Sequence, residues 1–320
     1  LFGNKLSATF DFYNRKTRDI LLTLPLPGIT GMNEPYQNAG VVQNRGWDLE
    51  LKHTNTVGKF RYQIGFTLSD VHNKILDLKG AGPIISGYNL KAEGYPINSI
   101  YGYKALGLFR TEEQLAESPK QTFSSYDLGD IRYTDLSDAG AANTIDREDR
   151  TVIGNANPKF TFGMTNNFSW KGLNLNILIT GSYGNDIFNA SRIETEGMAS
   201  GNNQTTTVLR RWRIPGQQTD VFRSDNPSWN VKNSTYWVED GSYLKVKNIT
   251  LSYDITSPKL KRINITRIQP YVSLQNFITW TNYSGYDPEV SQSESATQMG
   301  IDWGTYPNVR TVVVGLNLTF

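Results

Sequence analysis

The chain has 320 residues, of which 38% are hydrophobic, and it carries 32 Lys and Arg against 30 Asp and Glu. Mean hydropathy is −0.45, and no apolar run reaches the roughly 18 residues of a membrane-spanning helix, which excludes a helical membrane protein. A net charge of +2 gives no nucleic-acid footprint, and the absence of Cys excludes disulfides, thiol catalysis and zinc–thiolate sites. No signal peptide precedes the first strand-like residues, so we expect the natural N-terminus to lie upstream of Leu1.

Alternation between apolar and polar residues recurs along the chain with the period of two that gives a strand two unlike faces. The segments are 6–12, 47–52, 60–69, 160–170, 173–180, 249–255, 265–280 and 311–320. With their flanks, most reach the roughly 9–11 tilted residues that cross a bilayer, whereas soluble strands average about 5–6. The segment around Trp47 is the shortest. These lengths predict an all-β transmembrane antiparallel barrel with about eight strands in this chain.

The connections between these segments fall into two classes. Lys171-Gly172 and residues 55–59 have the composition of tight hairpin turns. The others are long: 25–40, 79–158, 185–240 and 281–309. Short turns at one end and long loops at the other are typical of outer-membrane barrels. If the C-terminus is periplasmic, the last three long segments are extracellular, 256–264 is periplasmic, and 79–158 contains no crossing.

The final strand has one apolar face, formed by Val312, Val314, Leu316, Leu318 and Phe320. In a soluble protein such a terminal strand would favour edge aggregation, whereas in a membrane barrel this face meets lipid. The spacing of Gly315, Leu318 and Phe320 also resembles the terminal signal that barrel-assembly machinery reads. We therefore predict that these three residues act in assembly.

Several sequence blocks, in order along nearly the whole chain, resemble one family, the SusC/RagA-type TonB-dependent transporters of the Bacteroidetes outer membrane. The blocks are Tyr13-Asn-Arg-Lys-Thr-Arg-Asp19, Asn38-Ala-Gly40 with Gln43-Asn-Arg-Gly46, Gly129-Asp-Ile-Arg-Tyr-Thr-Asp135, Asp149-Arg-Thr-Val-Ile-Gly-Asn155 with Pro158-Lys-Phe160, residues 238–251, Asn276, and Tyr283-Ser-Gly-Tyr-Asp-Pro-Glu-Val290.

The resemblance implies that residues 1–320 are the C-terminal part of a plugged barrel of about 22 strands in the Gram-negative cell outer membrane. It also implies that the plug and the TonB-contacting segment lie upstream, and that a SusD-like surface lipoprotein covers the outer loops. The ligand would be a glycan or an oligopeptide, bound without any cofactor. The sequence does not decide between these two ligand classes.

The sequence shows no catalytic motif: it lacks G-x-S-x-G, P-loop, Rossmann and HExxH patterns, and its two His lie apart. We therefore expect no enzyme activity. The segment Asp135–Asp149 resembles a calcium loop, but Ser137 and Ala139 replace ligands, and 141–144 is an apparent insertion. We predict a solvated acidic loop with no tightly bound ion around Asp135, Asp138 and Asp146.

Aromatic residues of the long loops form the candidate binding site, because exposed aromatics stack on sugars or peptide side chains. The alternative is that they pack the loops together or lie in the interfacial girdle. The candidates are Trp212, Trp229, Tyr236, Trp237, Tyr283, Tyr286, Trp303 and Tyr306.

Two other architectures remain open at this point. One is a self-contained eight-stranded barrel that acts as an anchor or adhesin; the other is a secreted soluble β-sandwich that binds carbohydrate. Small polar residues on the inner face, such as Gly163, Thr165, Ser182 and Gly315, would leave an eight-stranded lumen underfilled. They suit a wide barrel around a plug.

Overall fold

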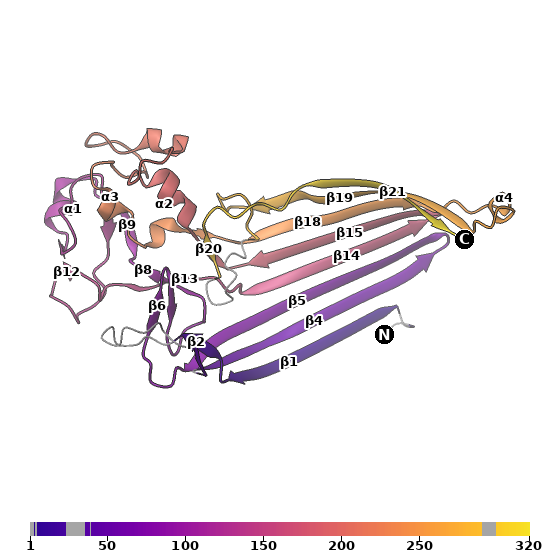
Figure 1. The fold of residues 1–320 in the computed structure, drawn as a ribbon, viewed down its shortest axis with the longest axis horizontal. Helices are drawn as coiled ribbons and strands as arrows, with labels where there is room; N and C mark the ends of the chain where they lie inside the picture. The colour runs from indigo at the N-terminus through magenta and orange to yellow at the C-terminus, as the bar shows by residue number, and fades with distance from the viewer. Residues whose placement is uncertain (1–2, 4, 24–35, 39, 290–298) are drawn as a thin grey trace.

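Eight long strands form one antiparallel sheet in the computed structural model, which describes residues 3, 5–23, 36–38, 40–289 and 299–320 (Figure 1). The sheet order is β1-β4-β5-β14-β15-β18-β19-β21, so each strand pairs with its sequence neighbour among the long strands. The bounds are β1 (Leu6–Arg18), β4 (Val41–Val57), β5 (Phe60–Asp77), β14 (Phe160–Trp170), β15 (Leu173–Tyr183), β18 (Tyr243–Tyr253), β19 (Arg267–Thr281) and β21 (Thr311–Thr319). The predicted strand number and antiparallel order are confirmed.

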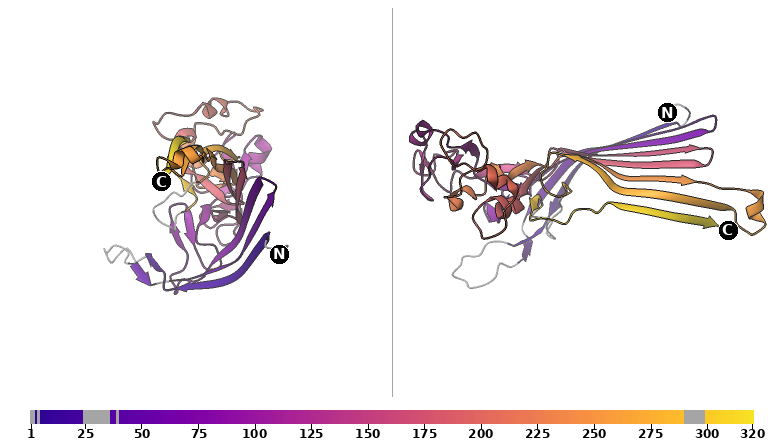
Figure 2. Two further views of the ribbon diagram at one scale, coloured as in Figure 1. Left: turned by 90° about the vertical axis from the view of Figure 1, so that its right-hand side faces the viewer. Right: turned by 90° about the horizontal axis from the view of Figure 1, so that it is seen from above.

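The sheet is an open curved wall, not a closed cylinder (Figure 2). Closure of eight strands would require β1 to pair with β21, and within the described residues these two strands are the edges of the sheet. The alternative of a self-contained eight-stranded barrel is therefore contradicted, because each edge leaves a row of backbone N–H and C=O groups without a neighbouring strand.

The two faces of the sheet have opposite character. One register row crosses five strands through Phe66, Met164, Ile179, Val246 and Ile278, and is wholly apolar. A row on the other face, which crosses β14 at Asn167, is wholly polar and consists of Gln63, Asn167, Asn176, Thr250 and Ser273. Many large side chains of the apolar face are exposed, which identifies this face as the one that would meet lipid.

Strand β4 corrects one prediction. The segment around Trp47 was expected to be the shortest, but β4 spans 17 residues and only β5, with 18, is longer. The alternation is hard to read in the sequence because polar residues lie on both faces beyond Leu51. Pairing with β1 on one side and β5 on the other still extends the strand. At its far end, Val42 packs in a small core with Ile75 and Leu78.

A β-bulge in β18 also departs from simple alternation. The β15 register passes from Leu178↔Asn248 to Ile179↔Val246, so Lys247 is an extra residue. A bulge reverses the parity of the residues that precede it. Consequently Lys245 lies on the polar face together with Thr180 and Thr279.

The short connections lie at one end of the sheet, near both termini of the drawn chain (Figure 1). Two are tight: the β4–β5 turn at Gly58-Lys59, and the β14–β15 turn, where Lys171 and Gly172 both have positive φ. Positive φ at both central residues is the signature of a type I′ turn. The third connection, between β18 and β19, carries the short helix α4 (Pro258–Lys261) and extends beyond the strand ends.

The long connections gather at the opposite end as a packed unit, here called the loop body, made of residues 78–159, 184–242, 282–289 and 299–310. Its small sheets pair β13-β8-β7-β6, β11-β9, β10-β12 and β17-β16-β20. No strand between β5 and β14 joins the large sheet in the described chain, as predicted, because β5 pairs directly with β14. The predicted long connection 25–40 falls largely outside the described residues.

The remaining elements are short. They are β2 (Leu21–Thr23), β3 (Tyr36–Asn38), β6 (Ile84–Ser86), β7 (Asn89–Lys91), β8 (Ser99–Gly102), β9 (Ala105–Leu108), α1 (Glu112–Ala116), β10 (Lys120–Gln121), β11 (Ile131–Tyr133), β12 (Thr144–Ile145), β13 (Thr151–Asn155), β16 (Asp186–Asn189), α2 (Ala190–Glu196), η2 (Thr206–Arg210), α3 (Pro227–Asn230), η3 (Thr235–Trp237), β17 (Val238–Asp240) and β20 (Ile301–Asp302). Among the described residues no helix has the length and apolarity needed to span a membrane.

Candidate functional site

The loop body has its own hydrophobic core, and two of the candidate aromatics lie inside it. Trp229 and Trp237 are fully buried. The Trp229 indole N–H donates to the backbone carbonyl of Ile131 (2.8 Å), and the Tyr133 hydroxyl donates to the carbonyl of Trp229 (3.1 Å). These bonds join segments about a hundred residues apart in the chain. In this structure Trp229 and Trp237 hold two long connections together.

Trp212 is also buried in the loop body, beside Gly129. A Cβ added at Gly129 would approach the Trp212 ring to 2.2 Å, and Gly129 has a φ of +84°. Only glycine fits this close approach and this backbone conformation without strain. Packing against the Trp212 ring therefore explains why glycine occupies position 129, the first residue of the Gly129–Asp135 block.

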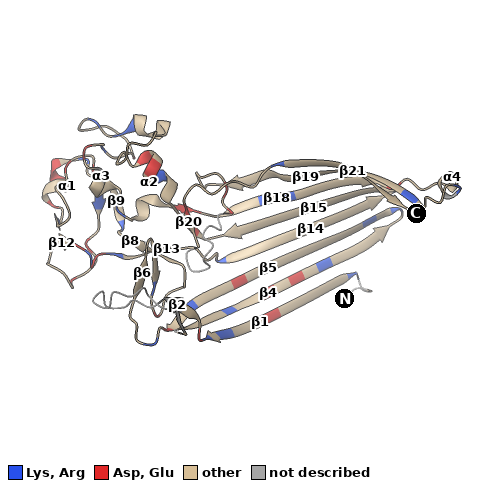
Figure 3. Cartoon of the chain, viewed as in Figure 1, with Lys and Arg blue, Asp and Glu red and all other residues tan. Residues whose placement is uncertain are grey.

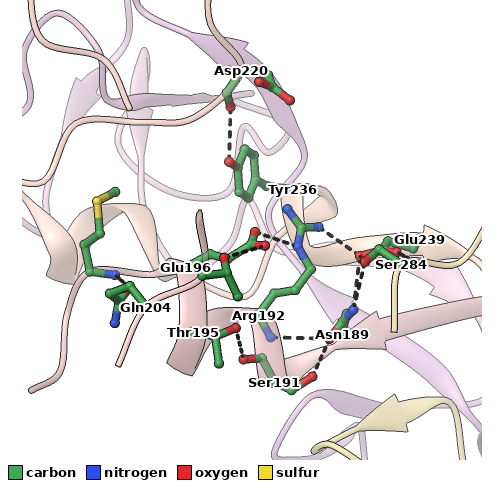
Figure 4. Close-up of polar contacts among 12 residues, drawn as sticks. Asn189, Ser191, Arg192, Thr195, Glu196, Gln204, Asp220, Tyr236, Glu239 and Ser284 are labelled. Atoms are coloured by element: carbon green, nitrogen blue, oxygen red, sulfur yellow. Dashed lines mark hydrogen bonds and ion pairs between the residues drawn. The ribbon is translucent and has the colours of Figure 1, made fainter. Parts of the chain in front are cut away.

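Arg192 on α2 forms a polar node beside the core (Figure 4). Its guanidinium lies 2.9 Å from Glu196 and 2.9 Å from Glu239, and it also covers the rings of Tyr236 and Trp237. The backbone N–H of Ser284 donates to the second oxygen of Glu239 (2.8 Å). These contacts join the 281–309 connection to the 185–240 connection.

Tyr236 is the candidate aromatic that faces this node. Its hydroxyl donates to the backbone carbonyl of Asp220 (3.1 Å). Burial raises the pKa of Tyr236 well above its ordinary value, and the Arg192 charge only partly opposes this shift. The phenol therefore stays protonated and acts as a hydrogen-bond donor within the loop body.

Tyr283 is buried and fixes the last long connection. Its hydroxyl donates to the Asp302 carboxylate, and burial together with that carboxylate raises the pKa of Tyr283. Asp302 also accepts the backbone N–H groups of Gly304 (2.8 Å) and Thr305 (2.9 Å). The segment that carries Trp303 is consequently held in one conformation.

Three candidates remain exposed on the 281–309 connection. Tyr286 is 77%, Trp303 61% and Tyr306 82% exposed, and we refer to them as the exposed aromatics. The Trp303 ring lies 5.6 Å from that of Tyr88, which in turn stacks on the buried Phe188 at 4.3 Å. Neighbouring β20 lies where the loop body meets the long sheet (Figure 1). Trp303 is thus an accessible aromatic residue that packs on Tyr88 and lies near the junction of the loop body and the long sheet.

A buried charge cluster fixes the same connection to the sheet. The ammonium of Lys245, 2% exposed, lies 3.0 Å from Asp287 and 2.7 Å from Glu289. Lys247, the bulged residue, lies 2.7 Å from Glu289. Because Lys245 is on the polar face, this cluster draws the start of the 281–309 connection over the inner side of β18.

The carboxylates of this cluster are held ionised. Burial alone would raise both pKa values, but backbone N–H donation and Lys245 lower the pKa of Asp287 below its ordinary range. Hydrogen bonds from Lys245 and Lys247 likewise outweigh burial and lower the pKa of Glu289. The attachment is therefore a charged one at neutral pH.

The predicted assembly residues lie on the edge strand β21. Gly315 is opposite Tyr271, and a Cβ added there would approach the Tyr271 ring to 2.5 Å. Leu318 and Phe320 are exposed on the apolar side, with Phe320 directly after the strand end. Close packing against Tyr271 thus explains the glycine at position 315 without any assembly signal. The assembly role of all three residues stays a prediction.

The acidic loop 135–149 is organised by Asp149 itself. This buried carboxylate accepts the backbone N–H groups of Leu136 (2.7 Å), Ser137 (3.0 Å) and Asp146 (2.7 Å). Burial opposes ionisation, but these three donors lower the pKa of Asp149. In the described part of the chain no cluster of three or more His, Cys, Asp or Glu could hold a metal ion. The predicted lack of a bound ion stays a prediction.

Sequence reasoning missed Lys245, Arg192 and Tyr88. The bulge hid the parity of Lys245, and the partners of Arg192 and Tyr88 are distant in sequence. One signal was present: Asp287 and Glu289 belong to the Tyr283–Val290 block, in a connection without Lys or Arg, so any cation that pairs with them comes from another segment.

No protein-family model matches the chain. The TonB-dependent receptor P3 of Formosa agariphila is 32% identical over the whole chain, which covers 33% of that relative. The TonB-dependent receptor SusC of Bacteroides thetaiotaomicron is 24% identical, over 99% of the chain and 30% of the relative. A solved structure of the RagAB peptide importer in its closed-closed state matches the whole chain and 34% of its own, with 26% identity and a TM-score of 0.81.

The chain belongs to the SusC/RagA-type TonB-dependent receptors. It spans about a third of the length of the curated relatives it matches. The eight-stranded sheet accordingly corresponds to about a third of the RagA receptor chain. Membership in this receptor family implies an outer-membrane location and agrees with the expectation of no enzyme activity. It also contradicts the soluble sandwich alternative.

Proposed function

We propose that this chain forms part of the wall of an outer-membrane transporter that imports a glycan or an oligopeptide. It works with a SusD-like surface lipoprotein, and energy is supplied through TonB by a segment upstream. The eight strands cross the outer membrane of a Gram-negative cell as the C-terminal part of a plugged barrel. The segments 79–158, 185–240 and 281–309 are extracellular, and the short turns are periplasmic.

The observation that carries this proposal is the open sheet with one apolar and one polar face. In a bilayer, each unpaired backbone group at a strand edge costs several kcal/mol, so β1 and β21 both require further strands. The inner face is lined with amides and hydroxyls, including Asn167, Asn176 and Ser273. Such a face suits a wide, water-filled lumen around a plug. A small barrel filled by its own side chains would need a bulkier interior.

The exposed aromatics are the part of the candidate list best placed to meet ligand. Trp303 and Tyr306 follow the Asp302 turn, and Tyr286 adjoins the Lys245 cluster, so all three start from a fixed backbone. Rigid aromatic side chains bind sugars or peptide side chains at low entropic cost. The lipoprotein would rest on 79–158 and 185–240, the larger part of the loop body, with ligand between.

The test uses uptake by cells that express the complete protein carrying this chain. Fluorescent oligopeptides and fluorescent glycan fragments are supplied separately, with and without an uncoupler that removes TonB energy. We expect energy-dependent uptake of one class. The double variant Trp303→Ala and Tyr306→Ala should lower that uptake at least about tenfold, since a lost aromatic contact costs about 1–2 kcal/mol each.

A matched control replaces two exposed aromatics of the apolar face, Trp280→Ala and Tyr183→Ala, which contact neither ligand nor lid in this proposal. Uptake by the control should stay within about twofold of the parent. Unchanged uptake by the Trp303 and Tyr306 variant would place ligand binding elsewhere. No uptake of either class, with the protein present in the outer membrane, would refute nutrient import.

A further inference from the structure

The two ends of the molecule carry opposite charge. The three short turns, 55–59, 171–172 and 256–264, contain Lys59, Lys171, Lys259, Lys261 and Arg262 and no acidic residue. The long segments 79–158, 185–240 and 281–309 instead hold 11, 7 and 4 acidic residues against 8, 6 and 0 basic ones. We call the five cations of the turns the basic turn face. Figure 3 shows Lys and Arg gathered at α4 and at the adjoining start of β19.

The described side chains of the basic turn face are free of carboxylate partners. Those of Lys59, Lys171, Lys259 and Arg262 are exposed. None of the ion pairs found in the described residues includes any of these four side chains. The pair nearest in sequence to the 256–264 turn joins Arg267 and Asp254 at the long distance of 3.7 Å. In the loop body, Arg192 and Arg223 are each paired with two carboxylates, whereas Lys104, Lys120, Arg147 and Arg213 are exposed and lie outside the ion pairs of the described residues. The charge at the turn end is consequently available to an external anion.

The cations lie where the apolar face of the sheet ends. Phe60, Trp170 and Leu173 are exposed residues of that face, and each directly adjoins a tight turn. The Lys171 ammonium lies over the Trp170 ring at 4.8 Å. Aromatic residues mark the interfacial layer of a membrane, and Lys side chains beside them extend to the headgroups. This position puts Lys59 and Lys171 at headgroup depth.

The α4 connection combines cations with exposed aliphatic side chains. Ile263 and Ile255 are exposed, and Ile263 directly follows Arg262. Mixed apolar and basic surfaces of this kind bind the interface of anionic membranes, where the aliphatic groups reach the acyl boundary. A hydrated anionic polymer would use the cations but leave the isoleucines in water. Lipid therefore explains both kinds of residue.

We propose that the basic turn face binds anionic phospholipid headgroups of the membrane leaflet that the turns meet. The inference rests on the proposed orientation of the sheet in the outer membrane but not on the import of any ligand. Each cation near an anionic surface adds to the binding, and the attraction falls off within a Debye length of about 10 Å at 0.1 M salt. The consequence is a local enrichment of anionic lipid around the turn end.

The experiment measures lipid retained by the complete protein. The protein is reconstituted with phosphatidylethanolamine containing a minor fraction of phosphatidylglycerol, extracted in mild detergent, and its bound lipids are quantified by mass spectrometry. We expect phosphatidylglycerol to be enriched several-fold over the bulk mixture. Replacing all five cations of the basic turn face by Gln should bring the retained lipid close to the bulk composition. The matched control replaces the same number of exposed cations of the loop body, namely Lys104, Lys120, Arg147, Arg210 and Arg213, by Gln.

Several outcomes separate the proposal from its rivals. Enrichment in the parent should decrease when the salt concentration rises from about 0.1 to 0.5 M, a result that needs no variant and so does not depend on folding. Retained lipid at the bulk composition, or an equal loss in the loop-body control, would overturn the proposal. If the variant with five Gln no longer cosediments with purified peptidoglycan but retains the lipid enrichment of the parent, the basic turn face binds that polymer instead. Cells that import ligand normally while the purified protein shows no enrichment would refute this inference and leave the proposed function intact.

Discussion

The turn end and the loop end of the sheet are built by different rules. At the turn end, each connection is determined by residues adjacent in sequence, such as Lys171-Gly172 with two positive φ values. At the loop end, each segment is held by partners far away in the chain, as Trp229 is by Ile131 and Arg192 by Glu239. Local sequence therefore determines one end, and tertiary packing determines the other.

Tryptophan shows the same difference within a single residue type. Trp170, at a tight turn, is half exposed on the apolar face, whereas Trp229 in the loop body is fully buried and donates a hydrogen bond. The first suits a membrane interface and the second a soluble core. The chain thus joins a wall whose apolar surface faces outward to a body whose apolar surface faces inward.

The largest effect is expected from a variant that unfolds the loop body and leaves the sheet folded. Trp229→Ala removes a buried ring and its hydrogen bond to Ile131, which should destabilise the loop body by about 3–5 kcal/mol. Limited proteolysis should then cut within 79–158 and 185–240, while heat-modifiable mobility shows a folded barrel. Trp303→Ala, an exposed position, serves as the control and should leave the loop body resistant. Equal sensitivity of the two variants would contradict the assignment of Trp229 to a core.

Sequence predicted the wall well because strand alternation and turn chemistry are local. The segments 160–170 and 173–180 and the turn at Lys171-Gly172 lie close to their predicted places, whereas the segment 60–69 has the right start but β5 continues to Asp77. It underestimated β4, because the partners β1 and β5 extend a strand whose own pattern is weak. It misjudged the start of β18, because one bulged residue, Lys247, reverses parity without a sequence signature.

The candidate site was less accessible to sequence analysis. The candidate aromatics share only their position in the long loops, and this position does not distinguish Trp237, packed in a core, from Trp303, exposed on a turn. Their difference arises from contacts that span the chain, such as Tyr283 with Asp302 and Tyr88 with Phe188. Ligand contact by the exposed aromatics stays a prediction, and the comparison of Trp303→Ala with Trp229→Ala sharpens it.

The second-largest effect is expected where the Lys245 cluster joins the 281–309 connection to β18. Lys245→Met removes the buried cation but leaves Asp287 and Glu289, which are only slightly exposed. Removing one partner of a buried charge cluster costs about 3–5 kcal/mol, and the remaining Lys247 should reduce this to about 2–3. Hydrogen exchange should increase in 281–289 and in 301–309 but not in the strands. Lys232→Met, a cation without a buried carboxylate partner, should leave exchange unchanged.

The same junction should respond to acid. Because the pKa values of Asp287 and Glu289 are lowered in the folded protein, the cluster contributes its full stabilisation above their ordinary values of 3.8 and 4.5. That contribution decreases as the pH falls below this range and the carboxylates become protonated. The protection factor of 281–289, which corrects the exchange rate for the intrinsic pH dependence of the amides, should therefore be constant from about pH 7 to 5 and fall below about pH 4. A fall already complete at pH 6 would show that other groups control the attachment.

A smaller effect is expected at the edge of the wall. Gly315→Val would bring a branched side chain against the Tyr271 ring, because even a Cβ at this position would lie 2.5 Å from that ring. Overpacking of this kind costs about 1–3 kcal/mol. The folded fraction after refolding into detergent should fall, and the double variant with Tyr271→Ala should recover part of it. Thr311→Val, on the same face of β21, is the control. No rescue by the Tyr271 change would contradict the assignment of the defect to overpacking against Tyr271.

The smallest effect on stability, but a large one on assembly, is expected at the chain end. Phe320 is 78% exposed and follows the last residue of β21, so its deletion removes little buried surface. The free energy of unfolding in detergent should change by no more than about 0.5 kcal/mol, as for other exposed positions. If Phe320 with Leu318 forms the assembly signal, the amount of heat-modifiable barrel in the outer membrane of cells should nevertheless fall several-fold. Phe320→Tyr, which keeps the aromatic ring, should restore it. Normal cellular levels after deletion would refute the signal, whereas loss in cells together with equal loss of stability in detergent would make Phe320 a packing residue of the final strand.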